Sequence, residues 1–223
     1  MKPDRLEKLY KQQLTSPEAS LKELPLKHIL SKPSVYYPER PVDWNFDILE
    51  IGPGTGDFLF AMAEEHVEAK ILAIEIGNKR FERIKNRIQK RELTQITLIH
   101  ADARVPFHLD IPDNSIEKCF VLFPDPWPRN KHSHLRLLQK EFLSVLCKKL
   151  KPGGEFTLGT DVKDYATWAL GNIKTITGME NTFGKDDMRS ELPDIPMTFF
   201  AKKWQKMGRS FHFLRFKKVQ THP

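Results

Sequence analysis

Cysteine is scarce in this 223-residue chain, which excludes a disulfide framework. Cys119 and Cys147 are the only two, and their spacing is typical of neither a metal nor a redox centre. Both stand in apolar stretches, so we expect buried thiols and a reducing compartment, the cytoplasm. No apolar run approaches membrane-spanning length, and no apolar signal region follows the first five residues. We therefore expect neither membrane insertion nor secretion.

Internal repeats and low-complexity segments are also missing, and 39% hydrophobic with 29% charged residues is typical of a globular protein. The net charge of +7 favours a polyanionic partner, with nucleic acid ahead of an anionic membrane. Residues 1–45 are polar and proline-punctuated, and we expect a basic arm with a short helix over 6–13. Whether that arm is a frayed surface segment or contacts nucleic acid stays open. A single domain is expected over 46–219, with a tail at 220–223.

An apolar run ends abruptly at a proline-rich segment near the middle of the chain. Residues 119–123 read Cys-Phe-Val-Leu-Phe, typical of a buried strand, and Pro-Asp-Pro-Trp-Pro follows at 124–128. Proline cannot donate a backbone hydrogen bond, so the three prolines predict a stiff loop at the strand's carboxyl end. Ligands of open α/β sheets bind at such ends, so we interpret Asp125 as a site residue. We expect Trp127 to pack into the core, with stacking on a base as the alternative. Basic and imidazole groups follow it, namely Arg129, Lys131, His132, His134 and Arg136.

A glycine-rich turn follows an earlier strand. A strand over 46–51 is followed by Gly-Pro-Gly-Thr-Gly-Asp at 52–57 and by a helix over about 58–66. The turn lacks the Gly-Lys-Ser/Thr of a phosphate-binding P-loop, and Gly56 comes one step early for the dinucleotide fingerprint. Asp57, at the helix start, would also repel a pyrophosphate. The turn therefore favours a ligand without phosphates.

An acidic residue stands at or just past the end of each of the first three expected strands. Glu50 lies at the end of the first strand, Glu75 near the end of a second over 70–76, and Asp102 just past a third over 95–100. Glu75 occupies the position from which the acid of a nucleotide-binding fold accepts ribose hydroxyls. A helix is expected over 78–91, between the second and third strands. It has a basic face that we expect to be solvated, with a nucleic acid contact as the alternative.

The C-terminal third predicts further elements. Helical spacing of apolar residues begins at Leu135 and continues to Leu146, and Lys-Pro-Gly-Gly at 151–154 predicts a tight turn into a fifth strand over 155–159. Thr160 or Asp161 is expected to cap the next helix, and Asp161 shares the sheet edge with Asp125. We expect a helix over 197–204 and a last strand over 211–216.

Together these residues resemble the bacterial tRNA (guanine-N7)-methyltransferases over roughly residues 40–216. The most specific part is Phe-Pro-Asp-Pro-Trp-Pro at 123–128, followed by a basic segment and Leu-Gln-Lys-Glu-Phe-Leu at 138–143. The Glu-x-Gly-x-Gly-x-Gly turn is similar to the first motif of S-adenosylmethionine-dependent methyltransferases. The resemblance implies a Rossmann-like α/β fold, a doubly wound, mostly parallel seven-stranded sheet with helices on both faces. It implies S-adenosyl-L-methionine as cofactor and N7 of a tRNA guanosine, in the variable loop, as methyl acceptor.

The resemblance also implies roles for individual residues. Cofactor binding falls to Glu50, Gly52, Gly54, Gly56, Glu75, Asp102 and Asp125, and the chemistry of the reaction makes Asp125 our candidate for the catalytic residue as well. Substrate binding falls to Arg129, Asp161 and Thr198. The chain departs from the family at Ala201, where a Thr-x-aromatic-Glu motif usually supplies a carboxylate.

Guanine N7 carries no proton, so the transfer needs no general base. We expect Asp125 to stabilise the positive charge that grows on the purine. Arg129, Lys131 and Arg136 are expected to meet RNA phosphates. The two histidines of this segment have no further ligands at zinc spacing, so no metal is expected. The partner is tRNA, no membrane is involved, and the protein is a monomer or homodimer.

Three other functions remain open at this stage. A methyltransferase of the same fold on a non-RNA substrate shares the cofactor site. A non-catalytic RNA-binding relic is compatible with Ala201. A nicotinamide-dependent oxidoreductase is disfavoured by the glycine spacing.

Overall fold

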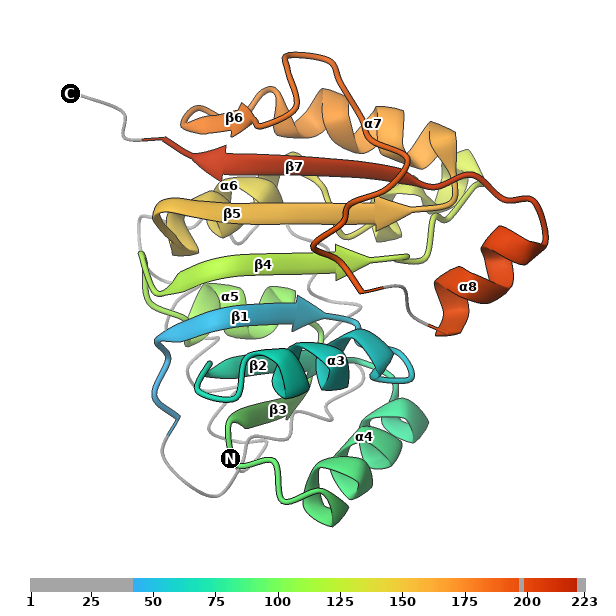
Figure 1. Cartoon of the computed structure of the whole chain (residues 1–223). Helices are drawn as coiled ribbons and strands as arrows, with labels where there is room; N and C mark the ends of the chain where they lie inside the picture. Colours follow the sequence, from blue (N-terminus) through green and yellow to red (C-terminus); the bar gives the residue numbers. More distant parts are fainter. Residues whose placement is uncertain (1–41, 197–198, 220–223) are drawn as a thin grey trace.

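The short apolar runs of the sequence form one sheet in the computed structural model, which describes residues 42–196 and 199–219 (Figure 1). Its strands are β1 (Phe46–Ile51), β2 (Ile71–Glu75), β3 (Ile96–His100), β4 (Ile116–Leu122), β5 (Leu150–Thr160), β6 (Met179–Asn181) and β7 (His212–Lys218). The spatial order is β3-β2-β1-β4-β5-β7-β6. β1 to β5 run parallel to one another, whereas β7 runs antiparallel to both β5 and β6. The expected seven-stranded, mostly parallel sheet is confirmed.

Helices cover both faces of this sheet. They are α3 (Asp57–Glu65), α4 (Asn78–Lys90), α5 (Arg104–Leu109), the 3₁₀ helix η2 (Asn130–Leu135), α6 (Lys140–Lys149), α7 (Lys163–Ile173) and α8 (Phe199–Lys206). α3, α4 and α8 contribute to one buried cluster, and α5, α6 and α7 to the other. In the part of the chain that the structure describes, no helix is both long and apolar enough to span a bilayer.

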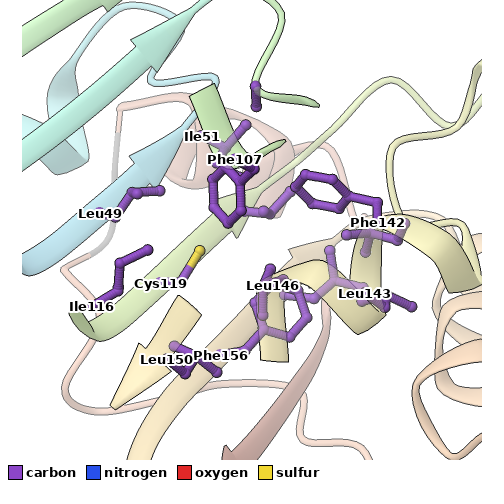
Figure 2. Close-up of a cluster of buried hydrophobic side chains, with 14 of the residues drawn as sticks. Leu49, Ile51, Phe107, Ile116, Cys119, Phe142, Leu143, Leu146, Leu150 and Phe156 are labelled. Carbon is purple, nitrogen blue, oxygen red and sulfur yellow. The ribbon is translucent and has the colours of Figure 1, made fainter. Parts of the chain in front are cut away.

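Successive residues of each central strand point to opposite faces, because side chains alternate along a strand. In β1, Ile48 packs with α3 and α4, whereas Leu49 packs with α5 and α6. Figure 2 shows the cluster to which α5, α6 and α7 contribute, with Phe107 of α5, Phe142 of α6 and Cys119 of β4 among its members. Cys119 and Cys147 are both buried and free, as the sequence predicts.

Two local predictions were wrong. The expected turn at 151–154 is part of β5, where the pairing with β4 shifts register between Ile116 and Lys118, so the extra residues form an irregularity rather than a loop. The expected helix from Leu135 is split into η2 and α6, because Arg136 has extended backbone. The sequence reading also missed α5 and the short strand β6.

The helix cap predicted after β5 is also wrong. α7 begins at Lys163 with Val162 at the N-cap and no side-chain capping bond. Thr160 instead accepts a hydrogen bond from the Val162 N–H at 3.2 Å. The expected helix over 6–13 lies outside the described residues.

The chain changes direction between β1 and β4. It runs outward from β1 to β2 and β3, then returns to place β4 on the other side of β1. In doubly wound sheets, this switch point opens a crevice at the carboxyl ends of the strands. Figure 1 shows α8 beside the carboxyl ends of β4 and β5. The glycine turn after β1 and the proline loop after β4 flank the switch point.

We expect Phe142→Ala to lower the free energy of unfolding by about 3–5 kcal/mol, because it removes a fully buried ring that contacts Phe107 with centroids 5.0 Å apart. Urea denaturation measures the loss. The matched control is Lys140→Ala at an exposed position of the same helix, expected to change stability by less than about 0.5 kcal/mol. Equal effects of the two substitutions would contradict the assignment of Phe142 to the core.

Candidate active site

The turn after β1 leaves its backbone open. Gly52 has φ +72°, and a Cβ placed there would meet nothing within 4 Å, so a ligand is free to approach the main chain. Gly56, with φ +84°, has no room for a side chain, since an added Cβ would lie 2.7 Å from the Phe60 ring. Gly54 also has positive φ, at 60°. The first glycine therefore faces ligand space, and the third closes the turn against α3.

Glu75 braces this turn against the start of α4. Its Oε2 accepts a hydrogen bond from the Gly54 N–H at 3.2 Å, and its Oε1 accepts from the Gly77 N–H at 2.6 Å. Arg80 Nε donates to the same Oε1 at 3.0 Å. The side chain is 1% exposed, so these bonds are made in the interior. The ribose contact expected of Glu75 stays a prediction, and the structure adds a bracing role that sequence reasoning missed.

Glu50 is the buried acid of the site that the protein leaves unsatisfied. It is 3% exposed, and its Oε2 has no hydrogen-bond partner among the described residues. Burial, followed by the charges of Glu75 and Asp57, raises the pKa of Glu50 to about 8. An unpaired buried polar atom costs free energy, so its presence beside an open turn is typical of a binding site.

Asp102 lies two residues beyond β3 and is held by Arg104. Its Oδ1 accepts from the Arg104 backbone N–H at 3.0 Å and from Nε at 2.9 Å, while Oδ2 accepts from Nη2 at 2.6 Å. Such a bidentate pair fixes the carboxylate plane. The adenine contact implied for Asp102 stays a prediction, now with a defined orientation for the acid.

The proline loop presents Asp125 to solvent at the end of β4. The residues two positions before and after Asp125 have left-handed backbone, Phe123 with φ 53° and Trp127 with φ 42°. The Phe123 N–H donates to the Gly159 carbonyl at 2.7 Å, which ties the loop to β5. Core packing of Trp127 was a wrong prediction, because its half-buried ring lies edge-on to His132 at 5.9 Å and joins neither cluster of the described core.

Arg136 points into this loop rather than toward solvent. Its Nε donates to the Pro126 carbonyl at 2.9 Å and its Nη2 to the Trp127 carbonyl at 3.2 Å. Arg129 and Lys131 are exposed nearby and remain available to a polyanion. The phosphate contact predicted for Arg136 therefore has no support from its geometry.

Asp161 follows β5 at the same edge and forms an ion pair with Arg209, which lies just past α8. The Arg209 guanidinium stacks on the Trp204 ring at 3.4 Å from the centroid. Thr198, the other residue expected to bind substrate, lies outside the described residues. Ala201 is buried, at 3% exposed, in the apolar cluster beneath α8.

The structure therefore gathers Glu50, Glu75, Asp102, Asp125 and Asp161 at the carboxyl edge of the sheet. Within residues 42–196 and 199–219, no group of three or more His, Cys, Asp or Glu is arranged to hold a metal ion. Sequence reasoning missed the basic partners of the acids. The available signals were short spacings, Arg104 two residues after Asp102 and Arg80 five residues after Glu75.

The site fits an uncharged or cationic ligand better than an anionic one. Its turn lacks a phosphate-binding signature, and the helix after it begins with an acid, Asp57. One oxygen of the buried Glu50 carboxyl has no partner among the described residues, and a positive group of a ligand would supply one. S-adenosylmethionine carries positive sulfonium and ammonium groups and no phosphate, so it matches these acidic side chains.

Comparison with known proteins agrees with this geometry. A family model described as "Putative methyltransferase" matches residues 45–214. The tRNA (guanine-N(7)-)-methyltransferase of Nitrosomonas eutropha is 32% identical over 198 residues, 86% of this chain and 88% of that protein. The enzyme of the same name from Buchnera aphidicola subsp. Baizongia pistaciae is 33% identical over 201 residues, 87% of this chain and 83% of that protein.

Solved structures share the architecture. The aminoglycoside resistance methyltransferase NpmB1 superposes with a TM-score of 0.55 at 20% identity, over 78% of this chain and 87% of that one. A SAM dependent methyltransferase from Aquifex aeolicus gives 0.53 at 16% identity, over 98% of this chain and 100% of that one. At such identities the likeness shows the fold alone, the Rossmann-like fold of these methyltransferases. Taken with the sequence matches, it confirms the predicted family: the chain belongs to the tRNA (guanine-N7)-methyltransferases.

Proposed function

We propose that this protein transfers the methyl group of S-adenosyl-L-methionine to N7 of a guanosine in tRNA, in the cytoplasm. The observation that carries the proposal is the pairing of β1 with β4, in which Ile51 lies opposite Val121. This pairing brings the open glycine turn and the unsatisfied Glu50 beside the loop that presents Asp125. The relatives at 31–34% identity are named for that reaction.

The cofactor would be held by the turn and the acids around it. When bound, it supplies an electrophilic methyl group on a sulfonium. Glu50 would face its cationic part, and Gly52 allows close approach of the backbone. Glu75 Oε2 and Asp102 Oδ2 each accept a single protein hydrogen bond, so each has a second lone pair to offer the ligand's ribose or adenine.

Positioning accounts for most of what the protein must do. Guanine N7 has a free lone pair, so no residue has to remove a proton, and correct alignment alone supplies about 7–11 kcal/mol. Positive charge grows on the purine as the methyl group arrives. A carboxylate at about 4 Å attracts that charge by roughly 4 kcal/mol at an effective dielectric of about 20. Asp125 is exposed in the free protein, so this attraction reaches its full size after RNA covers the loop.

Exposed cations beside Asp125 would hold the tRNA. Arg129 and Lys131 follow the loop directly, and Lys202 and Lys206 lie exposed on α8. Phosphate contacts of this kind make binding strongly salt-dependent. We include Asp161 and Thr198 in the substrate-binding surface, with Asp161 meeting the base edge through the oxygen that Arg209 leaves free.

Nucleoside analysis tests the reaction itself. After incubation of the protein with unmodified tRNA and S-adenosylmethionine, we expect N7-methylguanosine in the digested tRNA. A non-catalytic RNA-binding relic would bind tRNA in a titration but neither bind the cofactor nor produce the nucleoside. Methylation of guanosine at another atom would show the fold to be right and the acceptor wrong.

Asp125→Ala should lower kcat about 100-fold or more, because it removes the charge that faces the developing cation. Steady-state assays with labelled cofactor measure the loss, and calorimetry should show that cofactor binding survives at least in part. Asp113→Ala serves as control, since this exposed acid precedes β4 at the opposite edge of the sheet. Activity of Asp125→Ala within about threefold of wild type, under roughly 0.7 kcal/mol, would remove Asp125 from the mechanism.

Glu50→Gln should change how stability depends on pH. The pKa of Glu50 is raised from 4.5 to about 8, so between these values the folded chain holds a proton that the unfolded chain has lost. Stability therefore falls as pH rises through this window and stays constant above it. We expect a smaller fall for Glu50→Gln in urea denaturation between pH 5 and 8, and weaker binding of S-adenosylmethionine by calorimetry. Identical pH slopes for the two proteins would contradict the proposed state of this carboxyl.

A further inference from the structure

The loop that carries Asp125 is held in an unfavourable backbone conformation. Phe123 and Trp127 both have positive φ, at 53° and 42°, although neither is glycine. Large side chains avoid this region, and such conformations persist only where the surrounding structure holds them in place. The prolines stiffen the loop but offer no N–H groups. The Phe123 N–H ties the start of the loop to the Gly159 carbonyl of β5, so another group must hold the end of the loop.

Arg136 supplies such a constraint. Its guanidinium bridges two successive carbonyls, with Nε 2.9 Å from the Pro126 oxygen and Nη2 3.2 Å from the Trp127 oxygen. The planar fork of arginine suits this two-point contact, whereas lysine presents a single point charge. One of the two carbonyls belongs to the residue with left-handed backbone, and the other directly follows Asp125.

Helix α7 and η2 hold the guanidinium from the other side. It lies 4.8 Å from the centroid of the Trp168 ring and 5.7 Å from that of Tyr165, which is 1% exposed. The Arg136 backbone N–H donates to the Ser133 carbonyl at 3.1 Å, and Gln139 Nε2 donates to the same oxygen at 2.7 Å. The arginine is thus fixed at its backbone and along its ring-stacked face. The contacts connect α7, through one side chain, to the loop of Asp125.

We propose that Arg136 is a positioning residue for methyl transfer, which aligns Asp125 by clamping the Pro126 and Trp127 carbonyls against the aromatic surface of α7. The inference rests on the proposed function, and it assigns Arg136 to the chemical step rather than to RNA affinity. Arg129 and Lys131 lie in the same segment but are exposed, so their cationic groups are available to RNA. Their removal should weaken tRNA binding, whereas loss of the Arg136 fork should disturb the reacting geometry.

The test compares Arg136→Lys with Lys131→Met in steady-state kinetics over a range of salt. Arg136→Lys keeps the charge and loses the fork, so kcat should fall about 10- to 100-fold, with KM for tRNA and the affinity for S-adenosylhomocysteine within about threefold of wild type. Lys131→Met should instead raise KM and reduce its salt dependence. Trp168→Leu, which removes the stacking surface, should lower kcat in the same direction and by less. Thermal melting checks that each variant is folded.

Hydrogen exchange of the segment 120–130 gives a readout that does not depend on activity. Arg136→Lys should exchange faster there than wild type, with unchanged protection in β1 and β5. If wild type makes no N7-methylguanosine, the proposed function fails, but faster exchange would still support the clamp. An Arg136→Lys variant with kcat within twofold of wild type, or with a raised KM alone, would overturn the proposal. The proposal would also be overturned if kcat fell together with the melting temperature and the cofactor affinity, because the loss would then reflect general damage to the fold.

Discussion

The parallel pairing of β1 with β4 is the contact on which the site depends. These strands are distant in sequence, because β2 and β3 intervene, yet they lie side by side at the switch point. The pairing brings together two loops with different properties, a glycine turn open to a ligand and a proline loop that is rigid. The missing Cβ of Gly52 permits close backbone approach, and the prolines of the loop limit the motion of Asp125. A braced glycine turn beside a stiff loop suits a reaction that depends on alignment.

The site acids divide into two groups according to their partners. Glu75, Asp102 and Asp161 are each paired with an arginine, respectively Arg80, Arg104 and Arg209. These pairs brace the turn, orient an acid past β3 and connect α8 to the end of β5. Glu50 differs, because it is buried with an unsatisfied oxygen. The paired acids therefore brace the site. For a bound cation, the exposed Asp125 supplies negative charge and Glu50 supplies a carboxyl that the cation would ionise.

Much of the architecture was predictable from the sequence, because the buried strands read as short apolar runs closed by acids. β1 was predicted over the residues it occupies, and β2, β3 and β7 to within one or two residues at each end. α5 was missed, because it is six residues long and contains Pro106, which is tolerated in its first turn. The turn expected at 151–154 was wrong, because Gly153 and Gly154 also suit an irregular strand.

The partners of the site residues were less predictable. Arg209 lies 48 residues from Asp161, and that contact depends on how α8 folds back over the sheet. Arg136 was read as one more cation in a basic segment, since sequence does not show which way a side chain turns. Its inward direction depends on the extended backbone between η2 and α6, where helical spacing had predicted a continuous helix. The same break in the helix that sequence reading missed is what frees Arg136 to reach the proline loop.

The raised pKa of Glu50 links the stability of the fold to its ligand. At neutral pH the free protein holds this carboxyl largely protonated, because burial and two neighbouring acids raise its pKa to about 8. A neutral acid avoids most of the cost of burying a charge. A cation bound beside it would favour the ionised form, and the proton would then leave as the ligand enters. Without ligand, the neutral Glu50 costs the fold little stability, and with a cation bound the ionised Glu50 attracts the positive group. A buried acid can therefore serve binding without destabilising the sheet around it.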